Sequence, residues 1–383
     1  MKKSFHQKGF IIKRSRLFTW QKGKSRETAV IITIFLVLSL SYACANRGKE
    51  EIFRRDELLM DTVVSIQVVH SNPKEASHVL DKAFAFMKKL SNKMNSHNRN
   101  SEVAHLNARG YPGPFHVSDE LFQVIKESVE VSRITGGAFD ITVGPLLELW
   151  PIYRKNNFKV PDQEQLMKAL KLVGWQYLKL DPAARTVRFQ KKGMKIDLGG
   201  IAKGFIVDRT IEFLKKMGIR GALINAGGDI YAMGKTPSGD PWKIGVRHPR
   251  DPDRLVAVLG ISDGSVVTSG DYERYITKNG VKYTHVVDPR TGFTVQKTAS
   301  VTIIGNTTAF ADALATAMMV LGPDDGYAML VNFTGIEGLF ISEQPGITTK
   351  DGKPLLRYRA TPGFVKYALS LDPQLAKLVT GKS

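Results

Sequence analysis

A nine-residue stretch with a carboxylate, three glycines and a lysine has the spacing best suited to chemistry in this chain. It reads IDLGGIAKG over residues 196–204, which predicts a strand running into Asp197 and a helix carrying Lys203. The first turn of a helix has unpaired N–H groups and a partial positive charge, and both attract phosphate. Glycines let a ligand approach the backbone closely. The pattern favours a phosphate site, although a strand–turn–helix connection that binds nothing has the same appearance.

A second segment, HVVDPRTG at residues 285–292, places a histidine near a carboxylate and a Pro/Gly turn. The ordinary pKa of histidine lies close to neutral pH, so His285 is a candidate general base. A bend at Pro289 would bring Asp288 toward it. The alternative interpretation is a polar β-turn in which Asp288 bonds its own backbone.

A third segment, FADALATAM at residues 310–318, predicts an apolar helix that carries a carboxylate and a hydroxyl. Asp312 and Thr316 are four residues apart, so they share one helix face. A buried carboxylate is costly unless it is paired or binds a metal. Oxygen ligands of this kind suit a hard cation such as Mg²⁺. In the alternative interpretation, Asp312 complements the helix N-terminus and Thr316 only fills space.

Two glycine-rich segments add weaker signals. In GGAFDITVGPL, residues 136–146, Phe139 and Asp140 follow a glycine turn. The aromatic ring is suited to stacking on a flat ligand, but such a ring is more often part of a core. In INAGGDI, residues 224–230, the glycine pair follows a predicted strand and permits a bend.

The segments around these motifs mix helices with meandering strands. They predict an α+β fold with mixed, largely antiparallel sheets flanked by helices. Helices are expected at 73–94, 101–107, 118–136, 145–156, 161–173, 200–217, 307–321 and 323–333. Strands are expected at 58–69, 176–181, 186–190, 194–198, 221–225, 230–234, 242–247, 254–262, 265–269, 282–287 and 298–305.

The N-terminal segment has the features of an export signal. Residues 1–28 contribute +8 of the net charge of +19, and the uncharged apolar run 29–43 follows. That run is short for a membrane-spanning helix, which needs about 20 residues, and an uncleaved anchor is the alternative. Cys44 directly follows the run and resembles the lipidated cysteine of a bacterial lipoprotein, although Leu40 lies one residue further away than usual. Ordinary signal cleavage after Ala43 or Ala45 is the alternative.

These features divide the chain into an export signal with a candidate lipidation site (1–44), a polar tether (45–56) and one domain (57–375). Cys44 is the single cysteine, so an internal disulfide is excluded. The remaining charge of +11 is scattered and is not interleaved with aromatic residues, so we expect no nucleic-acid partner. Attraction to anionic lipid or to a phosphorylated ligand fits this charge better.

The order of these motifs is similar to that of the ApbE family of FAD:protein FMN transferases. IDLGGIAKG with Asp208 following, INAGGDIYAMG, HVVDPRTG and DALATA occur in sequence, preceded by MDT at 60–62 and by GGAFDITVGPL. The resemblance covers roughly residues 56–345. Several motifs in the right order are far more specific than any one of them alone.

The resemblance implies an exported bacterial enzyme of mixed α/β fold, often a lipoprotein, that uses Mg²⁺ as cofactor and FAD as substrate. It implies transfer of the FMN moiety to a Ser or Thr hydroxyl of a partner, with release of AMP. The implied partners are flavin-carrying subunits of membrane redox complexes such as the sodium-pumping NADH:quinone reductase (Nqr) and Rnf. The implied location is the cell envelope, on the periplasmic side of the cytoplasmic membrane, with a lipid or N-terminal anchor.

The resemblance also implies roles for individual residues. The positions that match metal ligands are Gly200, through its carbonyl, Asp312 and Thr316. The positions that match contacts of the flavin nucleotide are Met60, Ala138, Phe139, Asp140, Asp197, Lys203 and Val286. His285 matches the catalytic base, with Asp288 close by.

One position departs from the family pattern. Many members have a tyrosine four residues before the serine that matches Ser101, and here that position is His97. A tyrosine would cover the flavin and shield the phosphate from water, whereas histidine is smaller and can bind or activate water. Three hypotheses follow: a flavin transferase, an FAD pyrophosphatase that yields FMN and AMP, and an exported FAD-binding lipoprotein without catalysis. A local slip in the alignment without functional effect stays open for His97.

Overall fold

The computed structural model describes residues 49–152, 158–296, 298–348 and 354–380. It divides the chain into two units, 1–49 and 50–383, and the second unit contains every element described below. The lipidation and export predictions fall on residues outside the described ranges. None of the described helices has the length and apolar character that a membrane crossing requires.

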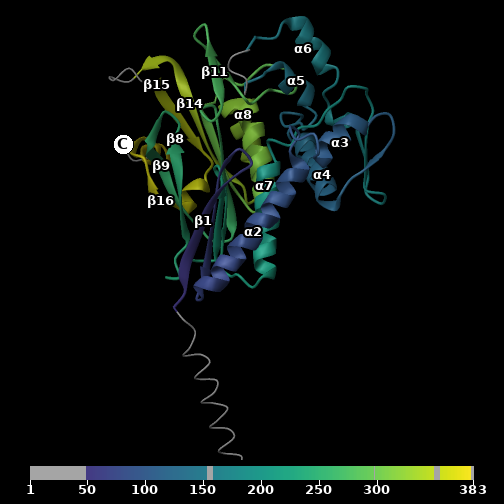
Figure 1. Cartoon of the computed structure of the whole chain (residues 1–383). Helices are drawn as coiled ribbons and strands as arrows, with labels where there is room; N and C mark the ends of the chain where they lie inside the picture. Colours follow the sequence, from purple (N-terminus) through teal and green to yellow (C-terminus); the bar gives the residue numbers. More distant parts are fainter. Residues whose placement is uncertain (1–48, 153–157, 297, 349–353, 381–383) are drawn as a thin grey trace, which may run out of the picture. The chain divides into compact units, whose positions relative to one another are not determined.

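An eight-stranded sheet forms the centre of this second unit (Figure 1). Its strands lie in the order β1-β2-β6-β7-β10-β13-β14-β15, and every neighbouring pair is antiparallel. The bounds are β1 Glu51–Leu59, β2 Thr62–His70, β6 Ala222–Ala226, β7 Asp229–Met233, β10 Gly264–Gly270, β13 Ser300–Gly305, β14 Glu337–Thr348 and β15 Pro354–Ala360.

The sheet is buried on both faces because its side chains alternate between two cores. Val267 and Ile303 point into the larger core, whereas their neighbours Val266 and Ile304 belong to the second core. Helices cover the first face: α2 Pro73–Met94, α7 Ala202–Lys216 and α8 Thr308–Leu330. A three-stranded sheet shares the second core, formed by β8 Trp242–His248, β9 Asp251–Ile261 and β16 Ala368–Leu371.

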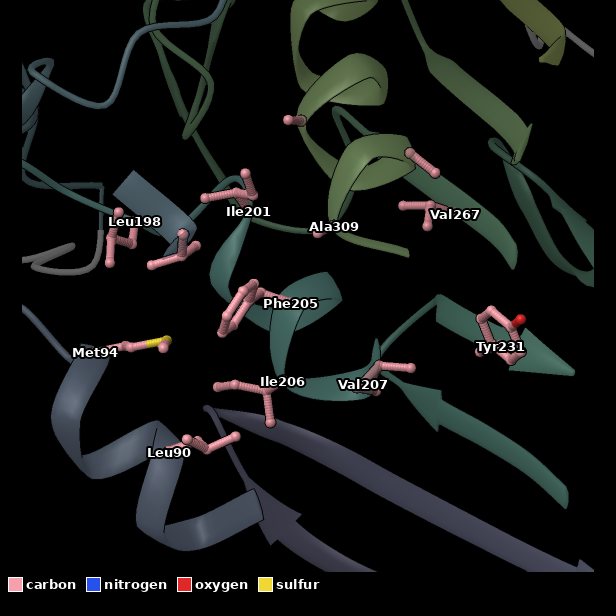
Figure 2. Close-up of a cluster of buried hydrophobic side chains, with 14 of the residues drawn as sticks. Leu90, Met94, Leu198, Ile201, Phe205, Ile206, Val207, Tyr231, Val267 and Ala309 are labelled. Carbon is pink, nitrogen blue, oxygen red and sulfur yellow. The ribbon is translucent and has the colours of Figure 1, made fainter. Parts of the chain in front are cut away.

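The centre of the larger core lies where helix α7 meets α2 and α8. Figure 2 shows Phe205 and Ile206 of α7 near Leu90 and Met94 of α2, with Ala309 of α8 close by. Gly204 makes this approach possible, because a Cβ atom there would lie 2.4 Å from the carbonyl oxygen of Thr308. Helix α7 is therefore fixed against α8 at its first turn.

Smaller elements lie beside this core. They are α3 Glu102–Arg109, β3 Phe115–His116, α4 Asp119–Ile134, α5 Gly144–Leu149, α6 Gln163–Leu170, β4 Leu178–Asp181, β5 Thr186–Phe189, β11 Tyr275–Lys278, β12 Val281–Thr284 and α9 Pro373–Thr380. Two short 3₁₀ turns, Trp175–Tyr177 and Phe364–Tyr367, complete the fold. The α+β fold with antiparallel sheets and flanking helices is confirmed.

Several element boundaries were wrong. The single strand expected at 58–69 is a hairpin, because the chain reverses at Met60 and Asp61 between β1 and β2. Residues 51–56, assigned to the tether, belong to β1, an edge strand whose polar side chains suit solvent. The strand expected at 282–287 ends at Thr284, and its partner β11 was missed.

Two further expectations near the glycine motifs also need correction. Residues 194–198 form no regular strand; Lys195 makes a single parallel bridge with Val143. The helix expected at 145–156 ends at Leu149, just before Pro151. The rest of that predicted helix includes 153–157, which lie outside the described ranges. By contrast, the break expected between helices at 307–321 and 323–333 is confirmed: α8 consists of two helical segments separated at Gly322, whose φ of 85° is not helical.

Candidate functional site

The site begins at the first turn of α7, where Lys203 meets two buried carboxylates. Its amine bonds to Asp229 of β7 and lies 3.8 Å from Asp312 Oδ2 of α8. Asp229 and Asp312 are 2% and 3% exposed, so almost no solvent reaches either carboxylate. One ammonium group therefore bridges carboxylates from a strand and a helix.

This cluster is electrostatically unbalanced, with two carboxylates for one ammonium. Burial alone would lower the pKa of Lys203, but Asp229 and Asp312 outweigh that effect and raise it. Burial, and then the charge of Asp229, raises the pKa of the Asp312 carboxyl. One hydrogen bond partly stabilises the charged form of Asp312: the backbone N–H of Gly204 donates to Asp312 Oδ2 at 3.3 Å. A further cation beside Asp312 would be favourable here.

Thr316 and Gly200 lie against each other one helical turn beyond Asp312. A Cβ atom on Gly200 would lie 3.1 Å from Thr316 Oγ1 and 3.2 Å from the ring of Phe139. The structure therefore brings together the backbone of Gly200, the hydroxyl of Thr316 and the Phe139 ring, three groups that the family resemblance assigned to one site. A carboxylate, a hydroxyl and a main-chain carbonyl are oxygen ligands suited to Mg²⁺.

Asp208 fixes the start of the helix that carries Asp312 and Thr316. Its two carboxylate oxygens accept hydrogen bonds from the N–H groups of Thr308 and Ala309, each at 2.8 Å. The sequence supplied Asp208 as part of a motif but gave it no role. Its role in the structure is that of a cap supplied by a neighbouring helix.

Asp197 lies in the glycine loop before α7. Its Oδ1 accepts from the N–H of Gly199 at 2.8 Å, and its Oδ2 accepts from the hydroxyl of Ser96 at 2.6 Å. Asn107 holds the preceding residue by two hydrogen bonds to the backbone of Ile196. The loop is thus shaped by side chains, which explains why a regular strand is not needed to aim Asp197.

His97 lies directly after Ser96, in the turn that follows α2. Its backbone N–H donates to Asn95 Oδ1 at 2.9 Å. The hydrogen bond from Ser96 to Asp197 joins this turn to the glycine loop. The predicted positions His97 and Asp197 therefore belong to two segments in direct contact, although 100 residues of sequence separate them.

The Ala138–Asp140 segment contributes a buried wall. All three residues are 5% exposed or less. Asp140 accepts hydrogen bonds from the backbone and hydroxyl of Thr142 and from the N–H of Trp175. Burial raises the pKa of the Asp140 carboxyl, and the hydrogen bonds oppose that rise. Its carboxylate thus holds the loop in place.

Met60 lies at the tip of the β1–β2 hairpin. Met60 and Asp61 have φ angles of 57° and 56°, a left-handed conformation that glycine or asparagine usually provides. The β6–β7 turn lies close to the residue that follows this tip, and only glycine fits there, because a Cβ atom on Gly227 would lie 2.4 Å from Thr62 Oγ1. Arg274 Nη2 donates to the carbonyl of Asp61 at 3.3 Å.

His285 is held by the same Arg274. The backbone N–H of His285 donates to the Arg274 carbonyl at 3.0 Å, and its ring Nδ1 lies 3.1 Å from that oxygen. A carbonyl oxygen only accepts, so the ring proton is assigned to Nδ1 and Nε2 is left with a lone pair. Burial and then the charges of Arg274 and Lys203 lower the pKa of His285 to about 4, against an opposing effect of the Arg274 carbonyl. The imidazole is neutral at physiological pH.

Asp288 and Val286 take different places beside His285. Val286 is buried and its carbonyl accepts from the N–H of Val295 at 2.9 Å. Both oxygens of Asp288 accept from Arg290, and its backbone carbonyl accepts from Gly292. The polar-turn interpretation of Asp288 is the one that these hydrogen bonds match.

The predicted residues thus form a connected set, and sequence reasoning missed several members. Asp229 and Arg274 received no role, and Ser96 was not singled out. Asp229 follows a conspicuous glycine pair, which was an available signal. Ser96 and Arg274 follow no pattern that spacing alone reveals, because their partners are distant in sequence.

Comparison with known proteins agrees with this arrangement. The sequence profile of the ApbE family matches residues 60–340. A Treponema pallidum (strain Nichols) protein named FAD:protein FMN transferase is 32% identical over 347 residues, covering 86% of this chain and 92% of that protein. A Haemophilus influenzae protein of the same name is 30% identical over 342 residues, covering 86% and 97%.

Solved structures give the same result. The ApbE protein of Thermotoga maritima MSB8 superposes with a TM-score of 0.74 at 32% identity, covering 84% of this chain and 100% of that one. The flavin transferase ApbE of Vibrio cholerae gives a TM-score of 0.73 at 28% identity, covering 83% and 99%. With its profile, its relatives and its fold in agreement, the chain belongs to the ApbE family.

Proposed function

We propose that this protein transfers the FMN moiety of FAD to a Ser or Thr hydroxyl of a partner protein and releases AMP. Two relatives that span most of the chain are named FAD:protein FMN transferase. The observation that carries the proposal is the buried cluster in which the Lys203 amine bonds to Asp229 and lies 3.8 Å from Asp312 Oδ2. The ammonium is suited to bind a phosphate and the Asp312 carboxylate to bind a cation, and His285 supplies a neutral imidazole as the base.

The step requires one bond to form and one to break at phosphorus. The acceptor hydroxyl oxygen attacks the phosphorus of the FMN half, and the anhydride oxygen leaves with AMP. His285 Nε2 accepts the hydroxyl proton, since Nδ1 already carries one. The product is a phosphoester between FMN and the partner. His285 must be neutral to act, and its low pKa ensures this.

The oxygen groups near Asp312 fit a magnesium ion. Asp312, Thr316 and the carbonyl of Gly200 would hold it, and the carboxylate excess around Lys203 would favour it. Among the described residues no group of three or more His, Cys, Asp or Glu side chains could hold a metal. Substrate phosphate and water would complete such a site. When bound, Mg²⁺ neutralises phosphate charge and stabilises the departing AMP.

The remaining predicted residues would bind the rest of FAD. Lys203 would contact phosphate and Asp197 the nucleotide, with the glycine loop between them. Met60, Val286 and the Ala138–Asp140 segment would line the flavin nucleotide.

We also propose that the acceptor is a flavin-carrying subunit of an Nqr- or Rnf-type membrane redox complex. The basic segment and apolar run at the N-terminus support export to the periplasmic side of the membrane. Cys44 would carry the lipid anchor. These statements rest on the sequence and the family resemblance.

Hydrolysis of FAD to FMN and AMP is the second candidate, and His97 favours it. The turn that carries His97 contacts the glycine loop through Ser96 and Asp197. A histidine at this position can bind water and would leave the phosphate less shielded than a tyrosine would. The same metal, lysine and base would serve both reactions.

The test is intact-mass analysis of a Thr-containing flavin-carrier domain after incubation with the full chain, FAD and Mg²⁺. An FMN-sized mass gain on the carrier, lost with His285→Ala, would support transfer. Free FMN and AMP beside an unmodified carrier would favour hydrolysis. His97→Tyr is the informative variant, because it should shift the product ratio toward the modified carrier. Bound FAD with neither product would contradict both reactions.

A further inference from the structure

Arg274 touches two parts of the site that belong to different elements. Its carbonyl accepts from the backbone N–H of His285 at 3.0 Å and lies 3.1 Å from the ring Nδ1. Its guanidinium donates to the carbonyl of Asp61 at 3.3 Å. One residue therefore contacts the proposed base and the hairpin tip that carries Met60.

The carbonyl of Arg274 determines which nitrogen of His285 is available. Because Nδ1 donates to it, Nε2 is the nitrogen that can accept a proton. Without this partner the two neutral tautomers would interconvert freely. The position of this one backbone oxygen thus determines whether Nε2 of His285 has the free lone pair that a general base needs.

That oxygen belongs to a loop rather than to a sheet. Residues 271–274 connect β10 to β11 and form no regular element. Asp271 anchors the first end through two hydrogen bonds of 2.7 Å from Arg250. The contact of Arg274 with Asp61 anchors the last end, next to the oxygen that His285 uses.

The hydrogen bond from Arg274 to the Asp61 carbonyl also stabilises the hairpin tip. Residues with a side chain and a positive φ are strained and persist only where the surrounding structure constrains them. Met60 and Asp61 are two such residues in succession. The guanidinium of Arg274 is one constraint, and the close approach of the β6–β7 turn at Gly227 to Thr62 is another.

We infer that Arg274 is a positioning residue that holds His285 in its Nδ1–H tautomer and keeps it in register with the flavin-lining turn at Met60. The inference rests on the proposed function for the meaning of the base. Its structural part, the tautomer and the anchoring of the turn, can be measured without any turnover.

Several charged groups near His285 influence its pKa. Arg274 and Lys203 both disfavour the imidazolium. Lys203 is itself paired with Asp229 and Asp312. On the neighbouring segments, Glu273 precedes Arg274, and Asp288 pairs with Arg290. Removing the Arg274 side chain takes away one of two nearby cations and loosens the carbonyl.

The test is nitrogen-15 NMR of the histidine rings in the full chain, with the signal of His285 assigned by its loss in His285→Gln. The wild type should show the Nδ1–H tautomer and titrate near pH 4. In Arg274→Ala the titration should move toward 6.5 and the tautomers should mix. Arg274→Gln keeps a donor for the Asp61 carbonyl without the charge. It should keep the tautomer and shift only the titration.

Kinetics supply the second readout. With Arg274→Ala, kcat for FMN transfer should fall about 10- to 100-fold, since misplacing a base by about 1 Å has this effect, while the Kd for FAD stays within about threefold. Lys278→Gln is the matched control. It removes a cation of the same hairpin whose amine donates to the carbonyl of Phe158 at 3.3 Å, away from the 271–274 loop, and it should change neither the tautomer nor kcat.

The outcomes separate this inference from the proposed function. Unchanged tautomer, titration and kcat in Arg274→Ala would overturn the inference, whatever the enzyme does. A wild type that modifies no carrier, or an active His285→Gln, would overturn the proposed function and leave the NMR result standing. If Arg274→Ala does not fold, Arg274→Gln and Arg274→Lys provide the same comparison.

Discussion

Two regions of the site differ in how the protein holds them. Lys203, Asp229 and Asp312 lie on α7, β7 and α8, which are packed into the largest core. His285 follows a two-stranded hairpin outside the main sheet, and a loop carbonyl holds its ring. The Lys203 region places charged groups beside two buried carboxylates. The His285 region fixes which ring nitrogen of His285 carries the lone pair.

The difference teaches what each region needs. Buried carboxylates near one lysine require rigid surroundings, because each uncompensated charge is expensive in a low dielectric. A general base needs a defined tautomer and access to a substrate that arrives from outside. A short hairpin near the surface can give that access. Variants should therefore affect the two regions in separable ways.

The largest effect is expected for Asp312→Ala. Loss of the carboxylate should lower FMN transfer by at least about 10³-fold, because a metal ion supplies several kcal/mol of charge stabilisation. Calorimetry should show that Mg²⁺ binding is weakened as well. Asp253→Ala, an exposed carboxylate of β9, is the control. Turnover at the wild-type rate would remove Asp312 from the metal site.

Asp312→Asn tests the Lys203 region through the stability of the protein. Above pH 8, where Asp312 is charged because its pKa is raised to about 8, the variant leaves one carboxylate for one ammonium and removes the repulsion between Asp229 and Asp312. In a chelator above pH 8 the melting temperature should therefore rise, while activity is lost. A fall in melting temperature would mean that the hydrogen bond from Gly204 matters more than the repulsion.

His285→Ala should reduce transfer by about 10²- to 10³-fold, the usual contribution of a general base. FAD binding, measured by fluorescence quenching, should change little. In the wild type, the low pKa of His285 keeps the base unprotonated down to about pH 4, so the acidic limb of kcat/KM, which reports the free enzyme, should lie near pH 4. A limb near pH 6.5, the ordinary value for histidine, would contradict the low pKa of His285.

Asp208→Ala tests how the core holds the metal region. Loss of its two hydrogen bonds to the α8 N-terminus should cost about 0.5–2 kcal/mol of unfolding free energy, as for other caps, and should weaken Mg²⁺ binding. Asn72→Ala removes the cap of α2, where Asn72 accepts from Lys74 and Glu75. It should cost similar stability and leave Mg²⁺ binding intact. If Asp208→Ala and Asn72→Ala changed the affinity for Mg²⁺ equally, Asp208 would have no specific role in positioning Asp312 and Thr316.

The smallest effect is expected for Asp288→Asn. Its carboxylate bonds Arg290 within an exposed turn, so we expect less than about a tenfold loss of kcat, the typical range for surface ion pairs being below 1 kcal/mol. Arg290→Ala should give a loss of the same size. A large loss for Asp288→Asn alone would restore the catalytic role that the sequence suggested.

Local pattern was enough for most elements. The 22 residues of α2 follow from the spacing of its apolar side chains, and α4 begins after the Ser118 cap as expected. The hairpin at Met60 was missed because its turn residues lack the usual glycine or asparagine. The predicted strand before Gly199 is wrong because this segment bonds to the side-chain amide of Asn107 and, through the N–H of Asp197, to the carbonyl of Ile141 instead of to a strand partner.

The sequence by itself determined the family, the α+β fold and the residues with useful chemistry, because side-chain type and local spacing are written in the chain. Only the tertiary structure decided that Lys203 bridges Asp229 and Asp312, that Asp208 caps the helix that carries Asp312 and Thr316, and that Asp288 pairs with Arg290. It also decided that Arg274 orients His285. Apart from the local Asp288–Arg290 pair, these contacts join residues far apart in sequence, and no local periodicity encodes them.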